Sequence, residues 1–176
     1  AACSGATLGA IDVAADAGVP MISYASSSPI ITDYYDDGYL FRVVPSDAQL
    51  GQAMVSVAHS AGFSNPAVVH ITVDYNENRA NAFANEWRDE IDSNHCGPGG
   101  TALFSYEQHT DDFSDIVSDI LDVGYEGSNY TTHDNCDSVV LFSYATDGAG
   151  FIEEMHAQHL DVPVLGGDSI ADRNFR

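Results

Sequence analysis

Short apolar runs alternate along this chain with longer segments in which apolar residues recur at helical spacing. We predict strands over residues 19–22, 39–44, 67–73, 102–106, 138–142 and 162–166. The runs are short and mostly continuous, which is typical of strands buried on both faces. This alternation of strands and helices predicts an α/β fold, in which a doubly wound parallel sheet lies between helices in three αβα layers.

Several of the segments between the strands carry signals for helix ends. Ser4 is expected to cap a first helix, and Ser46 with Gln49 forms a capping box for a second helix that ends at Gly62. Thr110 is expected to cap a later helix with two aspartates in its first turn, where negative charge is favoured. Two further helices are predicted after the third and fifth strands.

Polar and aromatic side chains follow the carboxyl ends of four predicted strands. Ligands of open parallel sheets bind in the crevice beyond those ends. The residues concerned are Ser26, Ser27, Ser28, Tyr75, Tyr144 and Asp168, with Ser4 facing the same crevice at a helix N-terminus. Hydroxyls and N–H groups suit a carboxylate, Asp168 suits an ammonium group, and the tyrosines suit an aliphatic portion. The set predicts a site for an amino acid zwitterion.

Each of these residues also has an interpretation without a ligand. Serines before Pro29 make a turn. Asp168 lies in the turn-like sequence Gly-Gly-Asp-Ser, where an acid can cap a helix, and either tyrosine can be an exposed aromatic at a strand end. His70 lies inside an apolar strand, where a histidine is more often packed than catalytic.

The charge excludes several classes of partner. Five basic and 27 acidic residues give a formal net charge of −22, and all five cations are arginines. Nucleic acid needs clustered cations, so we expect no nucleic-acid partner, and an anionic membrane surface is disfavoured for the same reason. Self-repulsion of this size favours a salt-adapted, halophilic-type protein, with an ordinary acidic secreted protein as the alternative.

Three cysteines, Cys3, Cys96 and Cys136, indicate the redox compartment. Cys96 and Cys136 each precede an apolar run. If those two runs are neighbouring parallel strands, the two thiols lie near the same sheet edge and can form a disulfide, which points to an oxidising compartment. Cys3 is left over, and an odd cysteine in a secreted chain suggests a missing partner.

Catalytic and metal sites have weak support in the sequence. A serine hydrolase of the nucleophile-elbow type needs Gly-x-Ser-x-Gly, which is absent. Glu153, His156 and His159 share a helical spacing that suits a metal, but a solvated helix face explains them better. The acidic loop 33–38 has Tyr35 at a position where an EF-hand needs an oxygen ligand. We expect no catalytic residue, no metal and no cofactor, and keep a metal-dependent or serine-based hydrolase as the remote alternative.

Three stretches resemble a known family. They are Cys3-Ser-Gly-Ala-Thr7, Gly18-Val-Pro-Met-Ile-Ser-Tyr-Ala-Ser-Ser-Ser-Pro29 and Phe41-Arg-Val-Val-Pro-Ser-Asp47. They are similar to type 1 periplasmic (solute) binding proteins, and most closely to the branched-chain amino acid (Leu/Ile/Val) binding proteins of ABC importers. The resemblance runs from residue 1 to about residue 168. It implies a Rossmann-like fold in two lobes that close on the ligand.

The resemblance also implies roles for individual residues. Ser4 and the loop Ala25, Ser26 and Ser27 would hold the ligand α-carboxylate from the first lobe. Tyr75 and Tyr144 would be pocket aromatics, and Asp168 would receive the α-amino group. Asn76 replaces the glycine that usually follows the pocket tyrosine.

By the same resemblance, residues 1–44 are a partial first lobe and residues 45–176 a nearly complete second lobe. The chain therefore resembles a fragment, and apolar surface left uncovered on the first lobe predicts a homodimer or strand exchange. The implied function is extracytoplasmic binding of an aliphatic or branched-chain amino acid for delivery to an ABC transporter permease. The alternative is a ligand-sensing domain of a receptor that uses the same fold.

Overall fold

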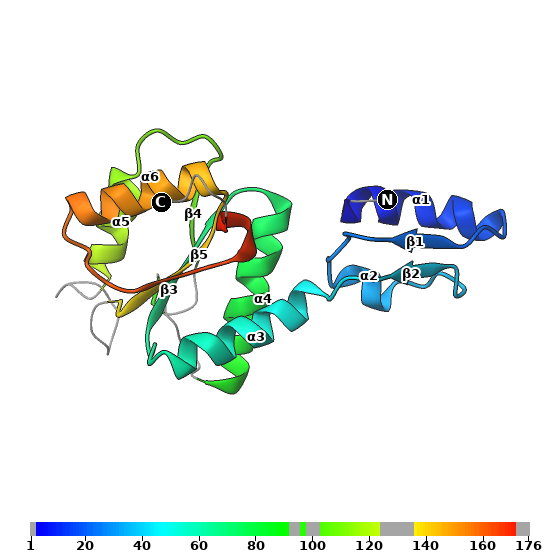
Figure 1. Cartoon of the computed structure of the whole chain (residues 1–176), viewed down its shortest axis with the longest axis horizontal. Coiled ribbons are helices and arrows are strands. Elements are labelled where there is room, and N and C mark those ends of the chain that lie inside the picture. Colours follow the sequence, from blue (N-terminus) through cyan, green and yellow to red (C-terminus); the bar gives the residue numbers. More distant parts are fainter. Residues whose placement is uncertain (1–2, 92–95, 98–102, 124–135, 172–176) are drawn as a thin grey trace. The chain divides into compact units, whose positions relative to one another are not determined.

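The computed structural model describes residues 3–91, 96–97, 103–123 and 136–171. The chain forms two compact units, residues 1–50 and residues 51–176. Figure 1 labels the helices and strands of both units.

Unit 1 is a small parallel sheet with one covered face. Strands β1 (Met21–Ser23) and β2 (Leu40–Arg42) pair so that Ile22 lies opposite Phe41. Helix α1 (Ser4–Asp16) runs along β1, and the short helix α2 (Ile30–Asp33) lies between the two strands in sequence (Figure 1). The covered face contains Ser23, which is fully buried, whereas Ile22 and Phe41 on the other face are 64% and 53% exposed.

Unit 2 is the larger α/β unit. Its four strands are parallel in the order β4-β3-β5-β6. They are β3 (Pro66–Ile71), β4 (Phe104–Tyr106), β5 (Ser138–Phe142) and β6 (Val164–Gly166). The helices are α4 (Asp74–Glu90), α5 (Ser114–Asp122), α6 (Ala145–Ala157), the 3-10 helix η2 (Asp168–Ile170) and most of α3 (Asp47–Ser60). The predicted parallel α/β fold is confirmed.

Helices cover both faces of the unit 2 sheet. Every residue of β3 and β5 is buried, because side chains of the two strands point alternately into two apolar layers. One layer includes Val69 and Leu141 with residues of α5 and α6. In the other, the ring of Phe142 lies 6.3 Å from that of Phe83 on α4. A fully buried side chain of this size contributes about 1.5–3 kcal/mol to folding, so these two strands are the centre of the unit.

Most predicted elements are confirmed, and two helix starts are wrong. At α1 the cap position is Cys3, while the Ser4 hydroxyl accepts a hydrogen bond from the Ser28 backbone N–H, 3.1 Å away. Helix α5 begins at Ser114 rather than after Thr110, because the Thr110 hydroxyl bonds to the Glu107 carbonyl instead, at 2.6 Å.

The predicted capping box at the start of α3 is confirmed by the hydrogen bond between Ser46 and Gln49. Gln49 Oε1 accepts the Ser46 backbone N–H at 3.1 Å, and the Ser46 hydroxyl accepts the Ala48 N–H at 3.4 Å. Helix α3 ends at Ser60, and Gly62 follows with φ of +90°, a conformation that costs glycine little.

The predicted disulfide between Cys96 and Cys136 is present, with a Cα–Cα distance of 5.4 Å. The assumed strand order behind that prediction is wrong, because β3 lies between β4 and β5. Cys96 reaches Cys136 because it pairs with Ala67 of β3, and its backbone N–H donates to the Pro66 carbonyl at 3.0 Å. Cys3 is a free, exposed cysteine.

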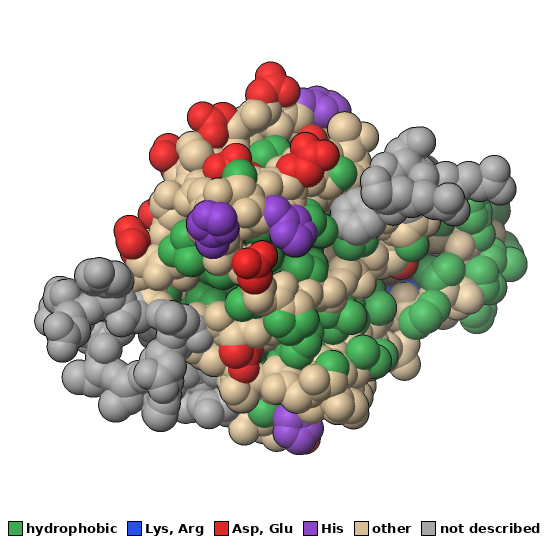
Figure 2. All heavy atoms as spheres, turned by 60° about the vertical axis from the view of Figure 1, so that its left-hand side comes forward, with side chains coloured by type: hydrophobic (Ala, Val, Ile, Leu, Met, Phe, Trp, Pro, Cys, Tyr) green, Lys and Arg blue, Asp and Glu red, His purple; other side chains and the backbone are tan. Residues whose placement is uncertain are grey.

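Acidic side chains are spread over the face of the molecule in Figure 2 rather than gathered in one patch, and almost no basic side chain is visible there. Within the described residues, no helix has both the length and the apolar character needed to cross a membrane.

Asp137 links the segments that precede β3 and β5, and it is next to Cys136 of the disulfide in sequence. Its carboxylate accepts hydrogen bonds from the Ser64 N–H at 2.7 Å, the Ser64 hydroxyl at 2.6 Å and the Ser138 hydroxyl at 2.6 Å. Partial burial by itself raises the pKa of this carboxyl, but the hydrogen bonds from Ser138, Ser64 and the backbone outweigh burial and lower the pKa.

We predict that Asp137→Ala lowers the stability of the protein at pH 7 by about 1 kcal/mol, because those donors lose their acceptor. The folded-state pKa is depressed, so the contribution is present above the unfolded-state pKa of about 4 and is lost as the pH falls through the folded-state pKa. Thermal unfolding from pH 7 to pH 3 should show the wild type and the variant converging in acid. Parallel curves over that range would contradict the assignment.

Candidate ligand site at the carboxyl ends of the strands

The order of the unit 2 strands creates a topological switch point at the carboxyl ends of β3 and β5. The chain passes from β3 to β4 on one side and returns to β5 on the other, so the strand order reverses between β3 and β5. Such a switch point is where open parallel sheets bind ligands. Tyr75 follows β3, Tyr144 follows β5 and Asp168 follows β6. The three predicted site residues of unit 2 therefore lie at one edge of the same sheet.

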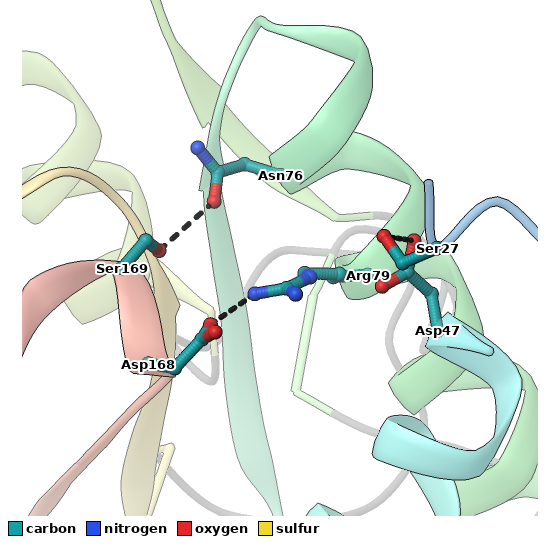
Figure 3. A network of polar contacts seen from close by, with 6 residues as sticks. All are labelled: Ser27, Asp47, Asn76, Arg79, Asp168 and Ser169. Carbon is teal, nitrogen blue, oxygen red and sulfur yellow. Dashed lines mark hydrogen bonds and ion pairs between the residues drawn. The ribbon is translucent and has the colours of Figure 1, made fainter. Parts of the chain in front are cut away.

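Two side-chain bridges join the turns on either side of β5. Arg79 on α4 donates from Nη1 to Oδ1 of Asp168, and the Ser169 hydroxyl donates to Asn76 Oδ1 at 3.2 Å (Figure 3). Asn76 and Arg79 are three residues apart on α4, so they share one face of the helix. We call these four residues the α4–η2 clasp. Because β5 lies between β3 and β6, the clasp spans the carboxyl end of β5.

Arg79 is the central member of the clasp. Its guanidinium carbon lies 3.8 Å from the centroid of the Tyr75 ring, a cation–π contact, and its side chain is only 7% exposed. The Asp168 side chain is 62% exposed. A buried cation therefore reaches a carboxylate that remains accessible to solvent.

Neither Arg79 nor Asn76 belongs to the set of site residues predicted from the sequence. The available signal was charge and spacing: Arg79 is one of five cations in the chain and follows Tyr75 by four residues, one helical turn. Asn76 is fully buried, and its Nδ2 atom has no hydrogen-bond partner among the residues that the structure describes, although Oδ1 accepts from Ser169.

Behind the same edge lies a second set of hydrogen bonds. The Tyr106 hydroxyl donates to Ser143 Oγ at 2.7 Å, and the Ser143 hydroxyl donates to the Tyr144 carbonyl at 3.0 Å. Burial raises the pKa of Tyr106; the Ser143 bond lowers it by less, and Asp147 adds to the increase, so the phenol stays protonated and remains a donor. Asp147, also buried, accepts the His109 backbone N–H at 3.1 Å. These contacts fix the turn that carries Tyr144, which is half-buried.

In unit 1, the serine loop makes its hydrogen bonds within the unit. Ser26 is fully buried, and its hydroxyl lies 2.7 Å from the Thr7 hydroxyl and 2.7 Å from that of Ser23. The Ser27 hydroxyl donates to Asp47 Oδ2 at 3.0 Å (Figure 3). Ser4 is half-buried beside the Ser28 backbone, and Ala25 is exposed. The hydroxyls of Ser26 and Ser27 thus hold the loop on α1 and on the start of α3.

Histidine and acidic residues do not cluster as metal ligands in the part of the chain that the structure describes. His70 is packed in β3 with 6% exposure, and its Nδ1 lies 3.0 Å from the Ile71 carbonyl oxygen.

Comparison with known proteins gives a family match and several relatives. Residues 1–164 match the family described as the receptor family ligand binding region. Metabotropic glutamate receptor 4 of Macaca fascicularis is 33% identical over 72 residues, which are 41% of this chain and 8% of the receptor. This chain therefore spans a small part of that relative.

Solved structures share the fold. A branched-chain amino acid ABC transporter protein from Rhodospirillum rubrum has a TM-score of 0.71 at 19% identity, covering 98% of this chain and 44% of its own. An ABC transporter substrate-binding protein from Desulfitobacterium hafniense, solved in complex with Leu, has a TM-score of 0.65 at 21% identity. That match covers 96% of this chain and 45% of that chain, so this chain spans less than half of either structure.

Removing either partner of the Tyr106–Ser143 hydrogen bond should change the unfolding free energy by a different amount. Ser143→Ala leaves the buried Tyr106 hydroxyl without its acceptor, so we expect a loss of about 1–3 kcal/mol in unfolding free energy. Tyr106→Phe should cost about 1 kcal/mol or less, because the Ser143 hydroxyl keeps its bond to the Tyr144 carbonyl. Denaturant unfolding of both variants measures the difference. The reverse order of stability would contradict the assigned direction of the hydrogen bond.

Proposed function

This chain belongs to the family of receptor ligand binding regions, and from that premise we propose that it is a non-catalytic, extracytoplasmic solute-binding domain for an amino acid. An aliphatic or branched-chain amino acid is the preferred ligand, for delivery to an ABC importer. The observation that carries the proposal is the edge of unit 2, where an accessible carboxylate, Asp168, follows β6, and Tyr75 and Tyr144 follow β3 and β5.

The chemistry of each unit suits one end of a zwitterion. In unit 2, Asp168 is an acceptor for an ammonium group, and the phenol rings offer apolar surface to an aliphatic chain. In unit 1, the ordered loop around Ala25, Ser26 and Ser27 lies beyond β1 and beside the first turn of α1, where backbone N–H groups suit a carboxylate. We assign residues 1–44 to a partial first lobe and residues 45–176 to the second lobe, which close on the ligand in the intact protein.

The partner and the location follow from the same proposal. A solute-binding protein of this class delivers its ligand to a transporter permease outside the cytoplasm. The disulfide between Cys96 and Cys136 supports an oxidising, extracytoplasmic compartment. The solved relatives include an ABC transporter substrate-binding protein in complex with Leu, which supports transport of an amino acid.

A ligand-sensing domain is the second candidate. It is favoured by the 33% identity to a metabotropic glutamate receptor over 72 residues. A sensor uses the same site and passes on lobe closure instead of delivering the solute. A membrane-spanning segment in the same gene product downstream of these residues would favour the sensor over the transport protein.

The ligand is testable by a thermal-shift screen of the twenty amino acids, amides and short organic acids in high salt, followed by calorimetry. We expect Asp168→Ala and Tyr75→Ala to weaken binding of the best ligand at least about tenfold, because they remove the ammonium acceptor and the aromatic wall. Asp161→Ala and Tyr35→Ala are matched controls, since both side chains are at least 70% exposed and neither residue follows the carboxyl end of a unit 2 strand. Equal affinities for all four variants would contradict the site.

Self-association is a separate expectation. The uncovered face of the β1–β2 sheet carries Ile22, Phe41 and Val43, the last 70% exposed, and parallel sheets are normally covered on both faces. We propose that in this chain a second copy covers that face. Sedimentation equilibrium in high salt should show dimers that the Ile22→Ser/Phe41→Ser variant reduces to monomer, whereas Tyr35→Ser should leave them. A wild-type chain that stays monomeric at high concentration would disprove the dimer.

A further inference from the structure

We propose that Arg79 decides which class of ligand this site accepts, because its guanidinium shares the carboxylate of Asp168 with the ligand. The inference deepens the proposed function and rests on it. It assigns Arg79 as a specificity-determining residue that sets the charge of the carboxyl-end edge of unit 2.

The position of Arg79 is fixed on two sides. The Tyr75 ring packs against the guanidinium at 3.8 Å, and Asp168 accepts from Nη1. Its side chain is 7% exposed, so it has little room to swing into solvent when a ligand arrives. The neighbouring bridge from Ser169 to Asn76 holds the backbone next to Asp168 against the same helix (Figure 3). A ligand therefore meets Asp168 with Arg79 already in place.

The carboxylate still has capacity for a second partner. An ionised carboxylate has two oxygens and accepts several hydrogen bonds, and the hydrogen bond from Arg79 Nη1 goes to Oδ1. The Asp168 side chain is 62% exposed, so a ligand can approach it. An ammonium group at this position is attracted by the carboxylate and repelled by the guanidinium.

Arg79 and Asp168 carry opposite charges, so in the wild type the guanidinium offsets part of the attraction that the carboxylate exerts on an ammonium group of the ligand. Removal of the arginine charge leaves an anionic edge that favours amines. Neutralisation of the aspartate leaves a cationic edge that favours carboxylates without an amine. The charges of Arg79 and Asp168 thus determine the relative affinity of the site for ligands with and without an ammonium group.

The experiment uses calorimetry on the whole chain to compare two probes, leucine and 4-methylpentanoate. They have the same carbon skeleton and differ only in the α-ammonium group. We expect Arg79→Met to raise the ratio of leucine affinity to 4-methylpentanoate affinity about tenfold, and Asp168→Asn to lower it below the wild-type ratio. Arg79→Lys keeps the charge and should leave the ratio near the wild-type value. Arg88→Met is the matched control, since it removes the same charge from the same helix, where Arg88 contacts Asn85.

Two outcomes overturn the inference. One is a ratio that Arg79→Met leaves unchanged, or changes no more than Arg88→Met does. The other comes from a double-mutant cycle on thermal unfolding: additive effects of Arg79→Met and Asp168→Asn would mean that the two residues do not interact in solution. This cycle needs no ligand. If neither probe binds any variant while the cycle shows coupling, the proposed function fails for these ligands, whereas the occupation of Asp168 by Arg79 is supported.

Discussion

The parallel pairing of β3 with β5, both buried along their whole length, is the constraint on which the rest of unit 2 depends. Two strands with apolar side chains on both faces need a helix layer on each side, and α4 on one face with α5 and α6 on the other meet that need. Parallel direction then brings the chain out of every strand at the same edge. Tyr75, Tyr144 and Asp168 follow strands that end at that one edge because of this packing, although up to 93 positions separate them in sequence.

Polar groups at that edge are held mainly by one another. Arg79 lies between the Tyr75 ring and Asp168, Ser169 bonds to Asn76, and Tyr106 bonds to Ser143. A preorganised arrangement of this kind lowers the entropy lost when a ligand binds, since the side chains are already ordered. It also fixes the balance of charge that a ligand meets. The acid at this edge is part of an ion pair, and its chemistry differs from that of an isolated carboxylate.

In unit 1, hydroxyl residues of the kind expected to bind a ligand stabilise the fold instead. The hydroxyls of Thr7, Ser23 and Ser26 are buried and bonded to one another, which satisfies polar groups that would otherwise destabilise a small two-layer unit. Its sheet is covered on one face only, with Ile22 and Phe41 on the other. An exposed apolar face of this kind is suited to a contact with another protein surface.

The sequence by itself determined the parallel α/β fold, nearly all of the strands and the capping contacts of α3, because these follow from local periodicity and side-chain hydrogen bonds. The disulfide was predicted from a wrong strand order, and the pairing of Cys96 with Ala67 of β3 is what brings it to Cys136. The sequence alone misplaced the starts of α1 and α5, where Ser4 and Thr110 bond to groups outside the predicted cap. It also assumed that β4 and β5 are neighbours, since strand order depends on packing between distant segments. The partners of Asp168 and Ser26 were decided only by the tertiary structure. Arg79 lies 89 residues from Asp168, and Thr7 lies 19 from Ser26, so no local pattern encodes either contact.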